Sequence, residues 1–134
     1  MSHLPVYTAV AAGLLMLLQL ILMLLVGLNR GKYAQSIGDG GNDDLLLAIR
    51  RHGNLAENAA IFLVLLALLE ILTGSTIIVL TLAIAFVVAR IAHAIGLSLG
   101  PNANPPRVVG AFGTLLSGLI LAVYLIYASL PLMN

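Results

Sequence analysis

The fold of this chain is decided by residues 45–72, LLLAIRRHGNLAENAAIFLVLLALLEIL. The segment is long enough to be a membrane-spanning helix, which needs about 20 residues to cross roughly 30 Å of hydrocarbon. Its uninterrupted apolar part, residues 59–69, is too short to cross alone, so the turns that carry Asn54 and Glu57 must lie within the membrane. Ionisable side chains at that depth are costly and normally face a partner or a water-filled cavity. The segment therefore predicts a transmembrane helix with a polar site inside it.

The composition of the whole chain supports the same interpretation. Of its 134 residues, 61% are hydrophobic and only 8% are charged, proportions that are unusual for soluble domains and typical of proteins with several membrane spans. We expect a single integral-membrane domain, residues 1–134, with an all-α architecture. The net charge of +1 and the lack of a long basic run argue against nucleic acid as a partner.

Three further apolar segments complete a predicted bundle of four transmembrane helices. Residues 5–28 carry no charge and form a longer run than the core of a signal peptide, so we interpret them as a retained first span. A polar, glycine-rich loop is expected at residues 29–44, and a tight break at residues 73–75. We predict an up-down bundle with spans at about residues 5–28, 45–72, 76–97 and 108–130.

The basic residues give an expected orientation in the membrane. All but one of them fall on the side of the first and third loops, which the positive-inside rule makes cytoplasmic, with both termini on the opposite side. Glu70 lies near that opposite interface, where we expect it to be solvated. The basic residues of the cytoplasmic side are Arg30, Lys32, Arg50, Arg51 and Arg107.

Small residues form a stripe along the last predicted helix, at spacings of three and four. Such residues let helix backbones approach closely in a membrane, where no hydrophobic effect drives helices together. The stripe contains no reactive group, so we interpret it as a packing surface. Its members are Gly110, Gly113, Thr114, Ser117 and Gly118.

The polar residues of the second and third helices form two faces that could meet. Arg50, Asn54 and Glu57 stand at positions i, i+4 and i+7 and therefore share one face of a helix. Arg90 and His93, three residues apart, share a face of the next helix.

Folding these two helices about residues 73–75 pairs residues that lie equally far from the turn. It brings Glu57 opposite Arg90, and Asn54 opposite His93. An ion pair between Glu57 and Arg90 would relieve much of the cost of inserting both charges. An offset of one turn and partners from another subunit remain open alternatives. The whole set could also be an internal salt bridge that only fixes the register of the helices.

Positive charge remains in excess at this end of the chain after that pairing. Arg50, Arg51 and Arg107 are the residues in excess, which predicts an anionic ligand, and arginine binds carboxylates bidentately. Arg51 could equally be a topology anchor, and the sequence does not choose a role for His52. The chain has no cysteine, so a sulfur nucleophile would have to come from a ligand. Its scattered histidines give no reason to expect a metal site.

These motifs resemble those of a known membrane-protein family. Residues 50–57, RRHGNLAE, fit the pattern Arg-x-x-x-Asn-x-x-Glu, and residues 90–93, RIAH, fit Arg-x-x-His. Both patterns are similar to those of the membrane-associated proteins in eicosanoid and glutathione metabolism (MAPEG). Residues 38–41, GDGG, are similar to the bacterial branch of that family. The resemblance covers all four predicted spans.

The resemblance implies a homotrimer in a bacterial inner membrane that binds glutathione at subunit interfaces open to the cytoplasm. Arg107 matches the arginine that stabilises the glutathione thiolate and would be the catalytic group. A thiol with a pKa of about 8.5 becomes a more abundant nucleophile beside a fixed positive charge. By position, the residues that would hold glutathione are Arg30, Arg50, Asn54, Glu57, Arg90 and His93.

The implied function is that of a microsomal-type glutathione S-transferase or peroxidase. Its second substrates would be lipophilic electrophiles or hydroperoxides that arrive from the bilayer. Leu97 stands where the mammalian synthases carry a tyrosine that contacts glutathione, so the resemblance does not extend to eicosanoid specificity. One alternative is a non-catalytic lipid-binding scaffold of the same fold, against which the presence of Arg107 weighs. The other is a small multidrug exporter, which would need a membrane-embedded carboxylate that residues 5–28 lack.

Overall fold

Four long helices make up the computed structural model, which describes residues 3–133. Each of the four is long and apolar enough to cross a membrane. The prediction of an all-α protein with four apolar helices is therefore confirmed. The helices are α1 (Val6–Lys32), α2 (Asp43–Thr73), α3 (Ile77–Ser98) and α4 (Pro105–Ser129), and the short 3-10 helix η1 (Leu130–Met133) follows α4.

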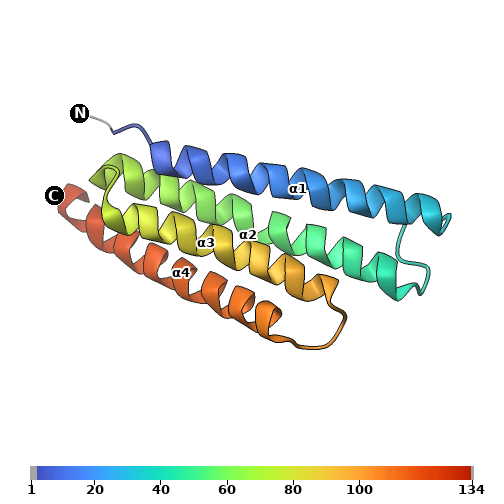
Figure 1. The fold of residues 1–134 in the computed structure, drawn as a ribbon. Helices are drawn as coiled ribbons and strands as arrows, with labels where there is room; N and C mark the ends of the chain where they lie inside the picture. Colours follow the sequence, from blue (N-terminus) through green and yellow to red (C-terminus); the bar gives the residue numbers. More distant parts are fainter. Residues whose placement is uncertain (1–2, 134) are drawn as a thin grey trace.

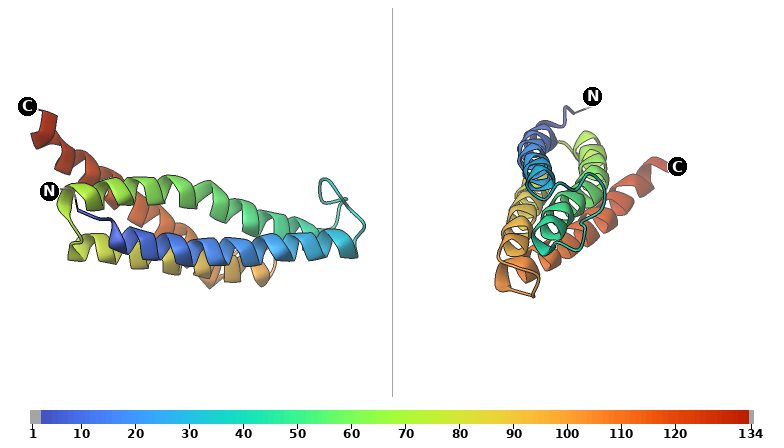
Figure 2. Two further views of the ribbon diagram at one scale, coloured as in Figure 1. Left: turned by 90° about the horizontal axis from the view of Figure 1, so that it is seen from above. Right: turned by 90° about the vertical axis from the view of Figure 1, so that its right-hand side faces the viewer.

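The helices lie along one another in an elongated bundle (Figure 1). The α1–α2 and α3–α4 connections lie toward one end, and the α2–α3 turn lies toward the other, together with the start of α1 and the end of α4 (Figure 1). In the described part of the chain, α1 packs on α2 and α3 but not on α4, whereas α4 packs on α2 and α3. The C-terminal end of α4 diverges from the other helices (Figure 2).

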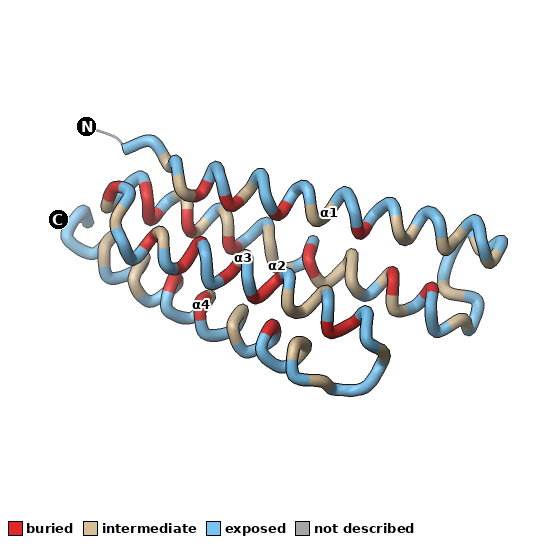
Figure 3. Tube along the Cα trace, viewed as in Figure 1, coloured by how far each residue is buried: buried red, intermediate tan, exposed pale blue. Residues whose placement is uncertain are grey.

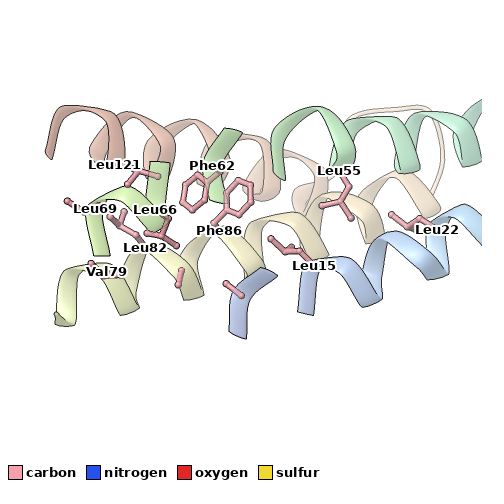
Figure 4. Close-up of a cluster of buried hydrophobic side chains, with 12 residues drawn as sticks. Leu15, Leu22, Leu55, Phe62, Leu66, Leu69, Val79, Leu82, Phe86 and Leu121 are labelled. Carbon is pink, nitrogen blue, oxygen red and sulfur yellow. The ribbon is translucent and has the colours of Figure 1, made fainter. Parts of the chain in front are cut away.

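The buried core follows the lines along which the helices touch. Its centre is a stacked pair of rings, Phe62 of α2 and Phe86 of α3, whose centroids lie 3.7 Å apart (Figure 4). Most other apolar residues are exposed, and exposed residues cover the outside of the helices (Figure 3). An exposed apolar surface of this extent is what lipid or another protein chain covers.

Two of the helices extend well beyond their predicted boundaries. α1 continues to Lys32 although we expected a loop from Asn29, and α4 begins at Pro105 rather than at residue 108. Basic residues in the last turn of α1 interact favourably with the helix dipole, and proline is well tolerated in the first turn of a helix. The sequence predicted helix ends where apolar runs end, but a helix continues into polar surroundings because its hydrogen bonds are internal.

The α2–α3 turn has the compact form that its residues predict. α2 ends at Thr73, and Gly74 follows with a positive φ of 79°, a conformation that glycine adopts without strain. The side chain of Thr76 then caps α3 by accepting a hydrogen bond from the backbone N–H of Val79. The turn therefore reverses the chain with only three residues between the two helices.

Glu70 is fully buried, contrary to the expectation that it would be solvated. Its carboxylate accepts hydrogen bonds from the backbone N–H groups of Tyr7 and Thr8, both at 2.9 Å. It also accepts hydrogen bonds from the hydroxyls of Thr8 and Ser75, both at 2.7 Å. α1 follows Pro5, which provides no side-chain cap, so Glu70 supplies the missing acceptor. The expectation was wrong because sequence spacing does not show that the start of α1 lies against the end of α2. We call these residues, Tyr7, Thr8, Glu70 and Ser75, the Glu70 cluster.

Candidate functional site

A very close approach of α3 and α4 forms one wall of the site. A Cβ atom added at Gly110 would lie 2.5 Å from the backbone nitrogen of His93 and 2.7 Å from the carbonyl oxygen of Ala89. Only glycine allows backbones to come this close. The predicted packing role of the small-residue stripe is confirmed at Gly110, whereas a Cβ at Gly118 would meet nothing within 4 Å.

A second close contact sets the position of Arg107. A Cβ atom at Gly96 would lie 2.4 Å from the backbone nitrogen of Arg107 and 2.6 Å from its Cα atom. The backbone of Arg107 therefore rests directly on α3. The guanidinium Nη1 of Arg107 donates a hydrogen bond of 2.6 Å to the carbonyl oxygen of Pro101, in the loop between α3 and α4.

A pocket of about 250 Å³ lies where α2, α3 and the start of α4 meet. Arg50 and Asn54 line it from α2, His93 lines it from α3, and Arg107 lines it from α4. The structure thus brings four of the predicted site residues together. The other residues that line this arginine pocket are Leu46, Leu47, Leu97 and Pro101.

Arg90 lies behind the pocket and is only 3% exposed. Its Nη1 donates to the side-chain oxygen of Asn54 at 2.7 Å, and its Nη2 donates to the carbonyl oxygen of Gly110 at 3.1 Å and to the hydroxyl of Thr114. Its guanidinium also lies over the ring of Phe86, 5.7 Å from the centroid. The Nε of Arg90 is buried without a hydrogen-bond partner among residues 3–133. Every acceptor that the described residues offer is neutral, so this buried charge is left uncompensated.

The predicted pairing of Glu57 with Arg90 is wrong, whereas Asn54 and His93 both line the pocket, although no hydrogen bond joins them in the described part of the chain. Arg90 bonds Asn54 instead, which is the offset of one turn that the sequence left open. Glu57 is exposed. Successive residues turn by about 100° around a helix, so Asn54 and Glu57 point about 60° apart, and only Asn54 faces α3.

Two predicted site residues, Arg30 and Glu57, lie outside the pocket. Nη1 of Arg30 donates to the carbonyl oxygens of Gln35, Ser36 and Gly38 at 3.0 to 3.1 Å and so organises the loop after α1. Glu57 lies on the outer surface of α2. Within a single chain, neither of these side chains lines the space that the other four surround.

Asn104 is the residue of the site that the sequence interpretation missed. Its side-chain oxygen accepts a hydrogen bond of 3.1 Å from the backbone N–H of Arg107, and its side-chain nitrogen donates one of 2.8 Å to the carbonyl oxygen of Gly96. An asparagine directly before a proline at a helix start is a recognised N-cap signal and could have indicated the first contact. Nothing in the sequence indicates the second contact, which joins two helices.

Comparison with known proteins gives one match. The chain matches the family model for the MAPEG family over residues 8–127. No curated protein and no solved structure matches it. The matched range includes every residue that lines the arginine pocket.

Proposed function

This chain belongs to the MAPEG family, and we propose that it is a membrane-embedded glutathione transferase or peroxidase. The family includes glutathione transferases and related enzymes, although its members vary in function. The observation that carries the proposal is the positive charge at the arginine pocket, which the described residues leave uncompensated. Arg50 and Arg107 line the pocket, and Arg90 lies buried behind it with only neutral acceptors.

Glutathione has the negative charge and the hydrogen-bond acceptors that this pocket lacks. It carries two carboxylates and a thiol that becomes anionic, and guanidinium groups bind carboxylates through paired hydrogen bonds. The buried Nε of Arg90 is a donor without an acceptor, so an anion that reaches it would relieve an unfavourable burial. Asn54 and His93 add neutral hydrogen-bonding groups to the same lining.

We assign the catalytic role to Arg107. It lies in the first turn of α4, at the positive end of the helix dipole. Both charges favour the thiolate form of a bound thiol. The thiolate would attack an electrophilic carbon, forming a carbon–sulfur bond as the leaving group departs or a strained ring opens.

The proposed site is completed by other copies of the chain. At about 250 Å³ the pocket is smaller than typical ligand sites of about 300–1,000 Å³, so a further wall is needed to enclose a tripeptide. We propose a homotrimer in which Arg30 and Glu57, which lie outside the pocket of one chain, reach the ligand at a subunit interface. The helices would cross a bacterial inner membrane up and down, with the α1–α2 and α3–α4 loops in the cytoplasm.

The second substrate would be lipophilic and would enter from the bilayer. A mostly apolar groove of about 370 Å³ runs between α2 and α4. Its lining includes Phe86 and Thr114, which also contact the guanidinium of Arg90. An apolar molecule in this groove would lie next to the polar site, which supports lipophilic electrophiles or hydroperoxides as the substrate class.

The proposal is tested by glutathione binding to the purified protein in detergent, measured by calorimetry together with thiolate absorbance and conjugation of a model electrophile. Arg107→Ala should lower thiolate formation and the conjugation rate by about 10²–10³-fold, the usual loss when one charge-stabilising donor is removed. Glutathione should still bind to this variant, because the remaining residues of the lining are unchanged. Glu57→Gln should weaken binding.

Arg51→Ala is the matched control. Arg51 is an arginine at the same end of the bundle, but its Nη1 donates to Ser98 and it does not line the pocket, so its loss should leave thiolate formation unchanged. If the unaltered protein does not bind glutathione at all, the transferase proposal is wrong and a non-catalytic lipid-binding scaffold becomes the better description. If it binds glutathione but Arg107→Ala forms thiolate normally, the role of Arg107 is wrong.

A further inference from the structure

We propose that Asn104 is the residue that positions Arg107, because it joins the start of α4 to the end of α3. The inference rests on the proposed function, which puts the guanidinium of Arg107 beside the glutathione thiol. Asn104 itself does not line the pocket, so it would act through Arg107 and not on the substrate.

The two ends of one amide group make the connection. Oδ1 of Asn104 accepts the backbone N–H of Arg107 at 3.1 Å, and Nδ2 donates to the carbonyl oxygen of Gly96 at 2.8 Å. Nδ2 has a second, longer contact of 3.3 Å with the carbonyl oxygen of Asn102. Because the amide is planar and short, α4 cannot slide along α3 without breaking one of the first two bonds.

This connection fixes Arg107 relative to His93. Gly96 is three residues after His93 on α3, and so close to the same face of that helix. The backbone of Arg107 rests on Gly96, and the Pro101 carbonyl holds the guanidinium of Arg107. The start of α4 is therefore held by three contacts. Two of them are made by Arg107 itself, and the third is made by the side chain of Asn104, which does not line the pocket.

The cap of α4 alone would not require asparagine. Serine, threonine and aspartate also cap helices well, since each offers an oxygen to the first backbone N–H groups. Only asparagine combines a side-chain oxygen acceptor with an NH₂ donor at this length. A charge interaction weakens with distance, so a shift of α4 would reduce the effect of Arg107 on a thiolate. The Nδ2 donor of Asn104 should therefore affect how far Arg107 favours the thiolate, whereas the Oδ1 acceptor should affect the capping of α4.

The test uses the full-length protein in detergent, with glutathione as the probe, and compares Asn104→Ser with Asn102→Ser. Serine at position 104 keeps a capping oxygen but lacks the NH₂ donor that reaches Gly96. The pH at which half of the bound glutathione is thiolate should rise by about one unit. At a pH below this midpoint, the thiolate fraction should therefore be about tenfold lower. Glutathione affinity should change much less. Asn102→Ser makes the same change at an exposed position of the same loop and should shift neither quantity. An unchanged midpoint in Asn104→Ser would overturn the inference.

A second measurement separates this inference from the proposed function. Amide hydrogen exchange of residues 107–110, measured without glutathione, should become about tenfold faster in Asn104→Ser and stay unchanged in Asn102→Ser. If the unaltered protein forms no thiolate but the exchange result is as expected, the transferase proposal fails while the positioning role stands. If the protein forms thiolate but neither exchange nor midpoint changes, only the positioning role fails. Should Asn104→Ser not fold, Asn104→Asp retains the cap and removes the donor, with Asn102→Asp as its control.

Discussion

Two polar clusters lie at opposite ends of the apolar helices and differ in how many of their polar groups have hydrogen-bond or charge partners. In the Glu70 cluster, one carboxylate accepts four hydrogen bonds from α1 and the α2–α3 turn, and Glu70 has no exposed surface. At the arginine pocket, Arg90 has only neutral acceptors and a buried Nε without a partner among the described residues. Two further arginines, Arg50 and Arg107, line the pocket itself.

This difference separates a structural cluster from a candidate binding site. A polar group inside a membrane protein must be satisfied internally, and the Glu70 cluster meets that requirement within one chain. The arginine pocket does not meet it among the described residues, which supports our proposal that a ligand or a second copy of the chain completes it. Ionisable residues at membrane depth are a reason to suspect a functional site. Whether their hydrogen bonds and charges are satisfied within the chain decides between a structural cluster and a binding site.

The largest loss of stability should follow from breaking the closed cluster. Glu70→Ala leaves two backbone N–H groups and two hydroxyls without their acceptor, so the free energy of unfolding should fall by about 3–5 kcal/mol. Unfolding in detergent, followed by circular dichroism, would measure this. Glu57→Gln is the control, because that carboxyl group is exposed, and it should change stability by less than about 0.5 kcal/mol. A small effect of Glu70→Ala would show that the cluster is not what anchors α1.

A smaller loss should follow from disturbing the wall of the open pocket. Gly110→Ala would put a methyl group 2.5 Å from the backbone nitrogen of His93, so α3 and α4 must separate. We expect a loss of about 1–3 kcal/mol in the free energy of unfolding, the usual cost of overpacking, together with weaker glutathione binding. Gly118→Ala, on the same helix but with nothing within 4 Å, should be neutral or slightly stabilising. Equal effects of the two substitutions would mean that the close contact does not shape the site.

The smallest effect on stability, and the sharpest test of the comparison, is expected for Arg90→Met. Replacing a buried, uncompensated charge with an apolar side chain of similar length removes a desolvation cost and also three hydrogen bonds, so stability should change by no more than about 1 kcal/mol. Glutathione affinity should nevertheless fall at least about tenfold, or about 1.4 kcal/mol. Calorimetry and unfolding of the same sample would measure both. If this variant is as unstable as Glu70→Ala, Arg90 is a structural residue.

Spacing within a single helix predicted the grouping of the candidate site residues in part, since Glu57 was assigned to the same face but lies outside the pocket. Arg50 and Asn54, four residues apart on α2, line the pocket together, as spacing on one helix indicates. Spacing failed across helices, because it paired Arg90 with Glu57 when the structure pairs it with Asn54. Equal distance from a turn fixes depth to within about a turn, but it does not fix which side of each helix faces the other.

The sequence by itself determined that this is a four-helix protein with the composition of a membrane protein, and which residues carry its unusual charges. These properties follow from local patterns, since apolar runs of membrane length and helical periodicity need no knowledge of neighbours. Only the tertiary structure decided that Glu70 is satisfied and Arg90 is not, and that Asn104 joins two helices. Whether a polar group is satisfied depends on atoms distant in sequence, and these meet only when the helices pack.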